Sequence, residues 1–399
     1  MNNAEIVELT HRHLVDIYGC LPIAFVRGHG AYLYDADGNR YLDFFCGLAV
    51  TSLGHGHPRV VRAIKEQAEK LTHVSNVFHT EPMARLAERL SNRFGNGRVF
   101  FGNSGAEANE AAIKLARRWG SNAGGGRYEI LAAQGSFHGR TLATLSATGQ
   151  EKYHQGFHPL VPGFRLVPFN DIAAMESARR DETAAIMIEP VQGEGGVVVP
   201  SPDYLRRLRD YCDRAKLLLI FDEIQVGVGR TGKFFAYEHA GVKPDIVTLA
   251  KALGGGMPIG AMIATADIAS NFTPGSHGTT FGGNPVSCAA ALGVLDAIDQ
   301  EGVLENAAQV GAYLMERLRV IAKKAPRVAE VRGLGMMIGI VLKTDARPVM
   351  EACLKEHLLV NATAGNVVRL LPPLNLTREE ADAGLAVIET ALIAAPGEK

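Results

Sequence analysis

The sequence predicts an α/β protein in which a mainly parallel sheet forms a large domain and a smaller α+β domain packs beside it. From about residue 58 to 297, short apolar runs alternate with helical stretches, which is typical of βαβ units. Beyond this region helices and strand-like segments alternate. We therefore expect an N-terminal segment, 1–57, that contributes to the small domain, a large domain, 58–297, and a C-terminal small domain, 298–399.

The composition is that of a globular protein without a charge bias. The 399 residues include 41 Lys and Arg against 42 Asp and Glu, a net charge of −1, and 47% are hydrophobic. This balance excludes predominant disorder and gives no electrostatic footprint for nucleic acid or an anionic membrane. No apolar run approaches the ~20 residues of a membrane-spanning helix, and the first residues lack the layout of a signal peptide. We expect a cytoplasmic protein.

The cysteines are odd in number and far apart, without the paired spacing of a zinc site or a disulfide framework. We expect them to be reduced and structural, and we expect no metal site. They are Cys20, Cys46, Cys212, Cys288 and Cys353.

The two ends of the chain show patterns of their own. Residues 31–45 carry two alternating aromatic segments around an Asp-Gly-Asn turn, which predicts a β-hairpin. Towards the C-terminus the sequence predicts helices over 303–322 and 347–357, with strands over 336–342 and 367–370.

Five candidate strands of the middle region each run directly into a cluster of small or polar residues. Every cluster lies on the carboxyl side of its strand, and in an open parallel sheet that edge is where ligands bind. Five clusters in succession indicate a single site. The strands are 99–101, 130–133, 185–188, 217–221 and 246–250.

The first of these clusters, residues 102–110 (GNSGAEANE), precedes a helix predicted over 111–119. Glycines and a hydroxyl before a helix leave backbone N–H groups free to face an anion, and the helix dipole adds to the attraction, so one interpretation is a phosphate-binding loop. The other is an ordinary helix cap, because Ser104 and Glu107 fit a capping box. The loop matches neither the dinucleotide fingerprint nor the P-loop.

Two further clusters begin with Asp222 and Lys251. A lysine at the buried end of a strand is suited to a Schiff base because desolvation depresses its pKa, although it can also extend its amine to solvent. Asp222 either needs a cationic partner or caps a helix from Glu223. The 29-residue separation leaves room for one crossover, which would place both at one sheet edge. A lysine, an aspartate for a pyridinium nitrogen and a phosphate loop are what pyridoxal phosphate (PLP) requires.

Six segments carry a resemblance to a known family. Residues 221–232 (FDEIQVGVGRTG) and 245–260 (DIVTLAKALGGGMPIG) resemble the signature of class III, or ω-amino acid, aminotransferases, with the cofactor lysine at Lys251. The similarity covers nearly the whole chain and implies the α/β fold type I of PLP-dependent transferases. The family's other blocks resemble, in the same order, residues 103–109 (NSGAEAN), 136–141 (SFHGRT), 189–196 (EPVQGEGG) and 278–285 (GTTFGGNP).

The resemblance implies roles for the residues around PLP. Lys251 would hold the cofactor as a Schiff base and transfer protons, while Asp222 would keep the ring nitrogen protonated. The backbone N–H groups of Gly105 and Ala106 would bind the phosphate, although Ala106 stands where many relatives carry threonine.

Three more residues complete the implied cofactor site. Phe137 would stack on the pyridine ring, and Gln225 would hydrogen-bond its phenolic oxygen. Thr280 would reach the phosphate of the other subunit, because in this family the site forms across a homodimer interface. Taken alone, Phe137 also fits a core aromatic and Thr280 a turn hydroxyl.

Within the family the sequence resembles the acetylornithine aminotransferases most. Arg140 and Arg369 look like the arginines that bind substrate carboxylates, with Glu194 as the partner that neutralises Arg369 in one half-reaction, and Thr279 as a further substrate contact. Without the resemblance, a surface ion pair is the favoured interpretation of each arginine. Leu48 stands where ornithine aminotransferases are expected to carry a tyrosine, which favours an N-acylated donor.

The implied reaction is transfer of the δ-amino group of N2-acetylornithine to 2-oxoglutarate, giving N-acetylglutamate 5-semialdehyde and glutamate in arginine biosynthesis. The alternatives are succinyldiaminopimelate, succinylornithine, ornithine or 4-aminobutyrate as donor, or a PLP-binding protein without catalysis. The sequence leaves open whether His138 and Glu189 are catalytic or structural.

Overall fold

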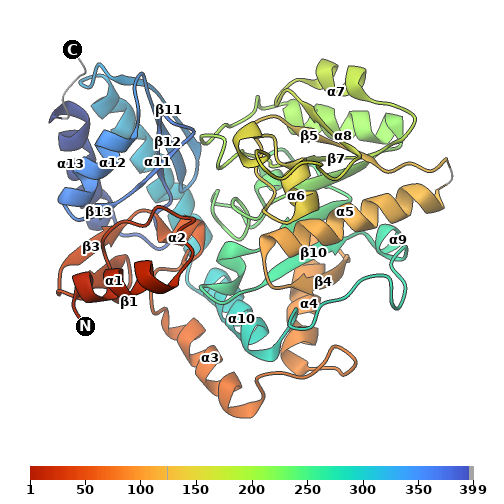
Figure 1. The fold of residues 1–399 in the computed structure, drawn as a ribbon, viewed down its shortest axis with the longest axis horizontal. Coiled ribbons are helices and arrows are strands. Elements are labelled where there is room, and N and C mark those ends of the chain that lie inside the picture. The colour runs from red at the N-terminus through yellow and green to blue at the C-terminus, as the bar shows by residue number, and fades with distance from the viewer. Residues whose placement is uncertain (124, 395–399) are drawn as a thin grey trace.

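The computed structural model describes residues 1–123 and 125–394, and a seven-stranded sheet lies at its centre (Figure 1). The strand order is β4-β10-β9-β8-β7-β5-β6. β10 runs antiparallel to both of its neighbours, and the other paired strands are parallel. All five strands predicted to end in polar clusters are present, and their carboxyl ends lie along one edge. The strands are β4 (Arg98–Gly102), β5 (Glu129–Ala133), β6 (Phe164–Val167), β7 (Thr183–Ile188), β8 (Leu218–Asp222), β9 (Ile246–Leu249) and β10 (Gly260–Ala264).

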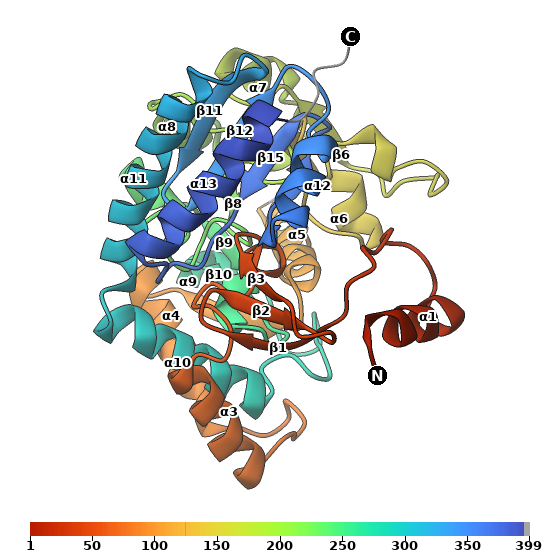
Figure 2. The same cartoon turned by 90° about the vertical axis from the view of Figure 1, so that its left-hand side faces the viewer.

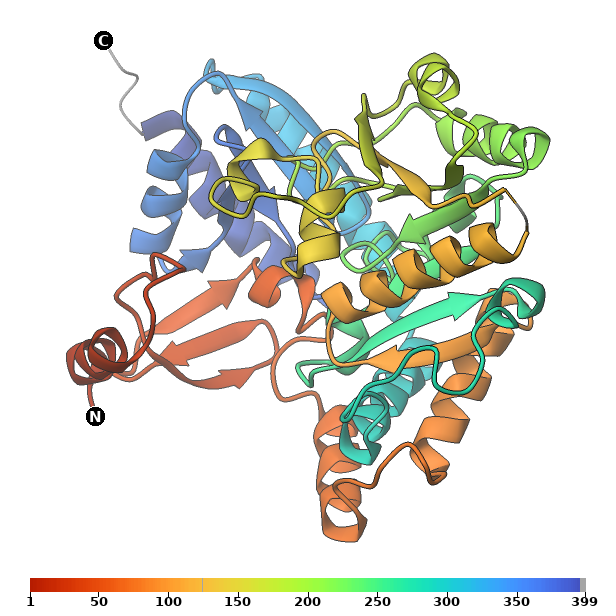
Figure 3. The ribbon, with the colours of Figure 1, turned by 45° about the vertical axis from the view of Figure 1, so that its right-hand side comes forward.

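Alternate residues of the central strands enter two separate cores because successive side chains of a strand point to opposite faces. Met187 and Ile220 pack with α5 on one face, while Ile186 and Phe221 join the core that contains α4, α8 and α10. Figure 3 shows α5, in orange, lying in front of the sheet and running alongside its strands. The helices around this sheet are α3 (Pro58–Lys70), α4 (Glu81–Phe94), α5 (Gly105–Asn122), α6 (Leu142–Ala147), α7 (Ile172–Ala178), α8 (Tyr204–Ala215), α9 (Ala266–Ala269) and α10 (Pro285–Gln300), with 3₁₀ turns η1 (Glu151–Tyr153), η2 (Ala236–His239) and η3 (Lys251–Gly254).

The two ends of the chain form two smaller sheets that lie together, red and blue, on the left of Figure 1. The predicted hairpin is confirmed as β2 and β3, and β3 also pairs in parallel with β13 from the C-terminal region. The N-terminal segment therefore packs with the C-terminal region, while the domain division at residues 58 and 298 stays a prediction. The first of these sheets contains β1 (Phe25–His29), β2 (Tyr32–Asp35), β3 (Arg40–Asp43) and β13 (Leu358–Leu359), and α1 (Asn3–His13) and α2 (Cys46–Ala49) flank it in sequence.

The second small sheet is antiparallel, in the order β11-β12-β15-β14, and three helices cover it (Figure 2). The helix predicted over 347–357 ends at Lys355 because His357 has a left-handed φ of 57°. No helix of the described residues is long and apolar enough to cross a membrane. The elements are α11 (Val303–Ala322), β11 (Val328–Leu334), β12 (Met337–Leu342), α12 (Arg347–Lys355), β14 (Asn361–Thr363), β15 (Val367–Leu370) and α13 (Arg378–Ala394).

A left-handed turn follows β3. Its four residues, Cys46–Ala49, have φ values of 48°, 57°, 67° and 65°, and only one of them is glycine. A non-glycine residue in this conformation costs roughly 1–2 kcal/mol. The turn persists because the buried Asp43 holds its start: Asp43 Oδ1 accepts hydrogen bonds of 2.8 Å from the backbone N–H groups of Phe45 and Cys46. Asp43 Oδ2 lies 2.7 Å from His55 Nε2.

We predict that Asp43→Ala will lower the free energy of unfolding by about 2–4 kcal/mol, because each buried donor left without a partner costs roughly 1–3 kcal/mol. Urea unfolding followed by circular dichroism measures the change. The exposed Asp16→Ala variant is the matched control and should stay within ~0.5 kcal/mol of wild type. Equal effects of the two substitutions would show that Asp43 does not hold the turn.

Candidate active site

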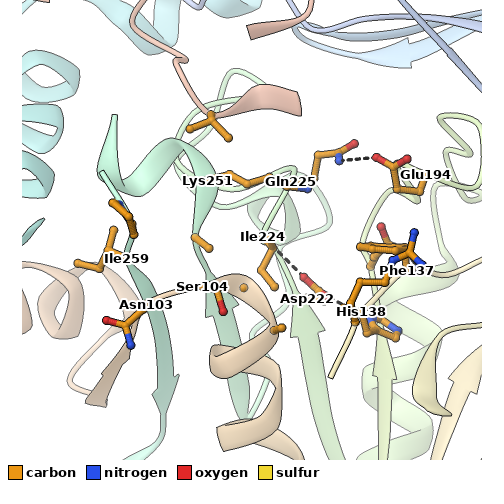
Figure 4. A pocket seen from close by; sticks show the side chains of 18 of the residues that line it. Asn103, Ser104, Phe137, His138, Glu194, Asp222, Ile224, Gln225, Lys251 and Ile259 are labelled. Atoms are coloured by element: carbon orange, nitrogen blue, oxygen red, sulfur yellow. Dashed lines mark hydrogen bonds and ion pairs between the residues drawn. The ribbon is translucent and has the colours of Figure 1, made fainter. Parts of the chain in front are cut away.

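A cavity of about 400 Å³ lies at the carboxyl edge of the central sheet (Figure 4). The ends of β4, β5, β7, β8 and β9 all contribute to its wall, as the five clusters predicted. Among the predicted site residues, those that line it are Gly105, Ala106, Phe137, Arg140, Glu194, Asp222, Gln225 and Lys251. Val50, just beyond the left-handed turn, also lines the cavity, whereas Leu48 is not among its lining residues.

Helix α5 begins at Gly105, six residues earlier than predicted, so its N-terminus opens directly into the cavity. Ser104 is the N-cap, its Oγ accepting a 3.1 Å hydrogen bond from the Glu107 N–H. Glu107 does not complete a capping box: its carboxylate accepts from the backbone and side-chain nitrogens of Asn103 instead, at 2.6 and 2.8 Å. The N–H groups of a helix's first turn have no intrahelical acceptor, so this end offers donors to an anion.

Two close approaches explain why glycine stands at this end of the cavity. A Cβ on Gly260 would lie 2.1 Å from the Ser104 carbonyl oxygen, and one on Gly105 would lie 2.8 Å from Ile224 Cδ1. Only glycine at these positions lets β10 and the segment after β8 approach the start of α5.

Asp222 ends β8 and is buried, with 2% of its surface exposed. Its Oδ2 accepts hydrogen bonds from Asn109 Nδ2 at 2.7 Å and from His138 Nδ1 at 2.8 Å. Its Oδ1 accepts from the Ile224 N–H at 3.0 Å. No helix starts at Glu223 in this described stretch, so the helix-cap interpretation of Asp222 is wrong. Three donors compensate the buried carboxylate and leave acceptor capacity toward the cavity.

Lys251 follows β9 and begins η3 with a left-handed φ of 41°. Strands β8 and β9 are neighbours, with Asp222 paired in register with Thr248, so the predicted juxtaposition of Asp222 and Lys251 is confirmed. Burial lowers the pKa of Lys251, and the nearby Glu194 carboxylate opposes this effect. The amine therefore faces the cavity in desolvated surroundings and is not extended to solvent.

Arg369, on β15, has no exposed surface, so the interpretation of this arginine as a surface residue is wrong. Its Nη1 donates to Glu194 Oε1 at 2.7 Å and to Gln225 Oε1 at 3.0 Å, and its Nη2 donates to Asn361 Oδ1 at 2.7 Å. Gln225 Nε2 in turn donates to Glu194 Oε1 at 3.2 Å. Burial raises the pKa of Glu194, but the Arg369 charge outweighs it and holds the pKa below its usual value.

Arg140 occupies the exposed side of the site. Its guanidinium carbon lies 4.0 Å from the centre of the Tyr153 ring and 5.5 Å from that of Phe137. The two rings meet edge to face at 5.6 Å. Stacking on aromatic rings positions the guanidinium without consuming its hydrogen-bond donors, which stay available for a carboxylate.

Glu189, at the end of β7, is buried beside the Asp222–His138 pair. Its two oxygens accept hydrogen bonds of 3.1 Å from the N–H groups of Phe137 and Gly193. Burial raises its pKa to about 7, with a smaller opposing effect of His138 and a further increase from Asp222. His138 and Glu189, which the sequence left unassigned, thus both belong to the wall of the site.

Thr279 and Thr280 do not line the cavity within one chain. Thr279 Oγ1 lies 3.2 Å from Asn103 Nδ2 at the cavity margin, while Thr280 is exposed. The role of Thr280 across a subunit interface stays a proposal.

Sequence reasoning missed Asn109, Thr248, Asn361 and Tyr153. Thr248 carries a detectable signal, since it is a polar residue inside the otherwise apolar buried strand β9, whereas Asn109 stands between Glu107 and Glu110 and carries none. Asn361 and Tyr153 carry none, because only tertiary structure brings them to the site.

Comparison with known proteins identifies the family. A family model described as aminotransferase class-III matches residues 17–392, and the chain belongs to this family. It is 50% identical over 383 residues to an acetylornithine aminotransferase of Caldanaerobacter subterraneus subsp. tengcongensis, covering 96% of this chain and 97% of the relative. An acetylornithine aminotransferase of Agrobacterium fabrum is 50% identical over 380 residues, 95% of each chain.

Solved structures confirm the expected fold. The ornithine aminotransferase from Toxoplasma gondii superposes with a TM-score of 0.96 at 35% identity, covering 99% of this chain and 95% of the other. The acetylornithine aminotransferase from Elizabethkingia anophelis gives a TM-score of 0.88 at 34% identity, covering 98% and 99%.

Because burial raises the pKa of Glu189, we predict that its contribution to the free energy of unfolding depends on pH. A pKa of about 7, above the ordinary 4.5, means that folded Glu189 holds its proton more tightly than unfolded Glu189. The stability it contributes is complete below pH 4.5 and is lost as the pH rises through 7. We expect the free energy of unfolding of wild type, minus that of Glu189→Gln, to decrease between about pH 5 and 8.

Urea unfolding of both cofactor-free proteins across this range measures the difference, and the exposed Glu182→Gln variant is the control, for which it should be constant. A constant difference for Glu189→Gln as well would contradict the raised pKa.

Proposed function

We propose that this protein transfers the δ-amino group of N2-acetylornithine to 2-oxoglutarate with PLP as cofactor, forming N-acetylglutamate 5-semialdehyde and glutamate in arginine biosynthesis. The observation that carries the proposal is the meeting of Lys251, Asp222 and the N-terminus of α5 in one cavity. The identity of about 50% to acetylornithine aminotransferases supports the choice of donor.

The residues of the cavity fit PLP at each of its polar groups. The N-terminus of α5, with the N–H groups of Gly105 and Ala106, suits the phosphate. Asp222, with acceptor capacity left beside three donors, suits a protonated ring nitrogen. Gln225 and Phe137 would contact the phenolic oxygen and the ring face, and the pyridine ring would supply an electron sink for the bond-breaking step.

Lys251 is the residue that we assign to carrying the cofactor and to moving protons. Because burial lowers its pKa, Lys251 Nζ is more readily available as a base than an exposed lysine. It would move a proton from the δ-carbon of the donor to the cofactor, and in the second half-reaction from the cofactor to C2 of 2-oxoglutarate. Its position at the end of β9, beside Asp222 on β8, keeps this amine at one fixed edge of the cavity.

Arg140 and Arg369 would bind carboxylates in turn. Arg140 lies at the exposed side, where it would hold the donor's α-carboxylate. Glu194 neutralises Arg369 while a donor with one carboxylate is bound, and would release it when 2-oxoglutarate brings a second carboxylate. Thr279 would bind substrate and Thr280 the partner's phosphate in a homodimer.

Ornithine is the second candidate donor, because the ornithine aminotransferase structure superposes at a TM-score of 0.96. The lower identity of that protein, 35% against 50%, and an apolar side chain at Leu48 favour the acetylated donor.

The test is a half-reaction without 2-oxoglutarate, followed through the absorbance of bound PLP. We expect N-acetylornithine to react fastest at equal concentrations of N-acetylornithine, ornithine, succinyldiaminopimelate and 4-aminobutyrate. Lys251→Ala should react with none of them. Preference for another donor would overturn the substrate assignment, and failure of wild type to bind PLP or react would overturn the whole proposal.

Glu194→Gln removes the charge that neutralises Arg369. We predict that kcat/KM for the amino donor will fall at least about tenfold relative to kcat/KM for 2-oxoglutarate, equivalent to ~1.4 kcal/mol. Separate half-reaction kinetics give both values. Glu330→Gln, which alters an exposed glutamate paired with Arg332, is the control and should leave the ratio unchanged. An equal loss in both half-reactions would contradict the neutralising role.

A further inference from the structure

One buried side chain, Asn109 on α5, joins three other elements of the site. Its Nδ2 donates to Asp222 Oδ2 at the end of β8 and to the His138 carbonyl oxygen on the loop after β5, both at 2.7 Å. Its Oδ1 accepts a 2.8 Å hydrogen bond from Thr248 Oγ1 on β9. Asn109 and Thr248 have no exposed surface, so water does not compete for these bonds.

The surroundings dictate the orientation of this amide. The His138 carbonyl oxygen and the Asp222 carboxylate are acceptors, so the group that faces both must be the NH₂. The opposite side must then accept, and the Thr248 hydroxyl supplies the donor. A flipped amide would place its oxygen against two acceptors, so only one arrangement satisfies all four groups.

The Asn109 amide also fixes the orientation of Asp222 and His138, the two partners of its NH₂ group. Asp222 Oδ2 receives Asn109 Nδ2 and His138 Nδ1, so His138 carries its proton on Nδ1. Its Nε2 is buried and has no hydrogen-bond partner among the described residues. Asn109 thus holds both Asp222 and the backbone of His138 with the same NH₂ group.

We propose that Asn109, locked by Thr248, is a positioning residue that orients the Asp222 carboxylate toward the cofactor ring. The proposal rests on the proposed function, since Asp222 acts there on the ring nitrogen of PLP. Neither Asn109 nor Thr248 lines the cavity, so both would act only through Asp222 and His138.

Three variants test the network in the PLP-loaded enzyme. Asn109→Leu removes both donors with little change in volume. Thr248→Val removes the hydroxyl of Thr248, and Thr248→Ser keeps a hydroxyl at this position. Thr183→Val is the matched control: Thr183 is also buried, at the start of β7 away from the cavity, and its hydroxyl donates to Glu129 Oε1 on β5 at 3.0 Å. Each protein is measured for kcat, donor KM, and the ratio of visible circular dichroism to absorbance of bound PLP, which reports the orientation of the ring in its site.

We expect Asn109→Leu to lower kcat by about 10- to 100-fold, the usual effect of losing a group that orients a functional side chain. The donor KM should change less than about threefold, and the circular dichroism ratio should change, because the ring is held differently. Thr248→Val should show a smaller fall in kcat and a smaller change in the circular dichroism ratio, and Thr248→Ser should have wild-type values of both. Thr183→Val should lower the melting temperature without either effect.

The outcomes separate this proposal from the proposed function. An active wild type together with an Asn109→Leu variant of unchanged kcat and circular dichroism ratio overturns the positioning role alone. If Asn109→Leu does not fold, Thr248→Val serves as the test. A wild-type kcat and circular dichroism ratio for Thr248→Val would likewise overturn the positioning role of Asn109. A wild-type protein that neither binds PLP nor reacts overturns the proposed function and this proposal with it.

Discussion

The architecture of the site depends on the burial of one carboxylate, Asp222, at the end of a fully apolar strand. An ionised carboxylate in such surroundings is stable only with several hydrogen-bond donors. These donors come from α5, from the loop after β5 and from the turn after β8. Because the requirement is met by three separate segments, satisfying it also fixes how those segments lie around the cavity.

The same principle applies to a buried arginine, Arg369, which lies behind the cavity-lining residues Glu194 and Gln225. Arg369 on β15 is bonded to Glu194 and Gln225 from the central-sheet region and to Asn361 from β14. The small antiparallel sheet and the central sheet therefore meet through a charged pair at the cavity. Of this pair, Glu194 lines the cavity and Arg369 is fully buried behind it.

Much of this arrangement was predictable from the sequence. Five apolar runs ending in polar clusters gave the parallel edge, and the spacing from Asp222 to Lys251 gave neighbouring strands, because βαβ geometry leaves few alternatives. The predicted start of α5 is six residues too late, because residues 105–110 read as a loop until the close approach of Ile224 and of Gly260 on β10 to the start of this helix is known. Asn361 and Tyr153 were unpredictable because strand register and loop packing, which the sequence pattern does not encode, place them beside Arg369 and Arg140.

The left-handed turn at Cys46–Ala49 bears on how the pocket can diversify. Its start is held by the Asp43 carboxylate, and the Leu48 backbone N–H donates to the Phe45 carbonyl oxygen at 3.1 Å, so the apolar Leu48 side chain takes no part in these hydrogen bonds. A substitution at position 48 therefore changes a half-buried side chain two residues before Val50, which lines the cavity, without requiring a new backbone conformation. The range of substitutions is nevertheless narrow, because β-branched residues tolerate a left-handed φ poorly. Unbranched side chains should therefore be tolerated best at position 48, provided that the Asp43 carboxylate that supports the turn is retained.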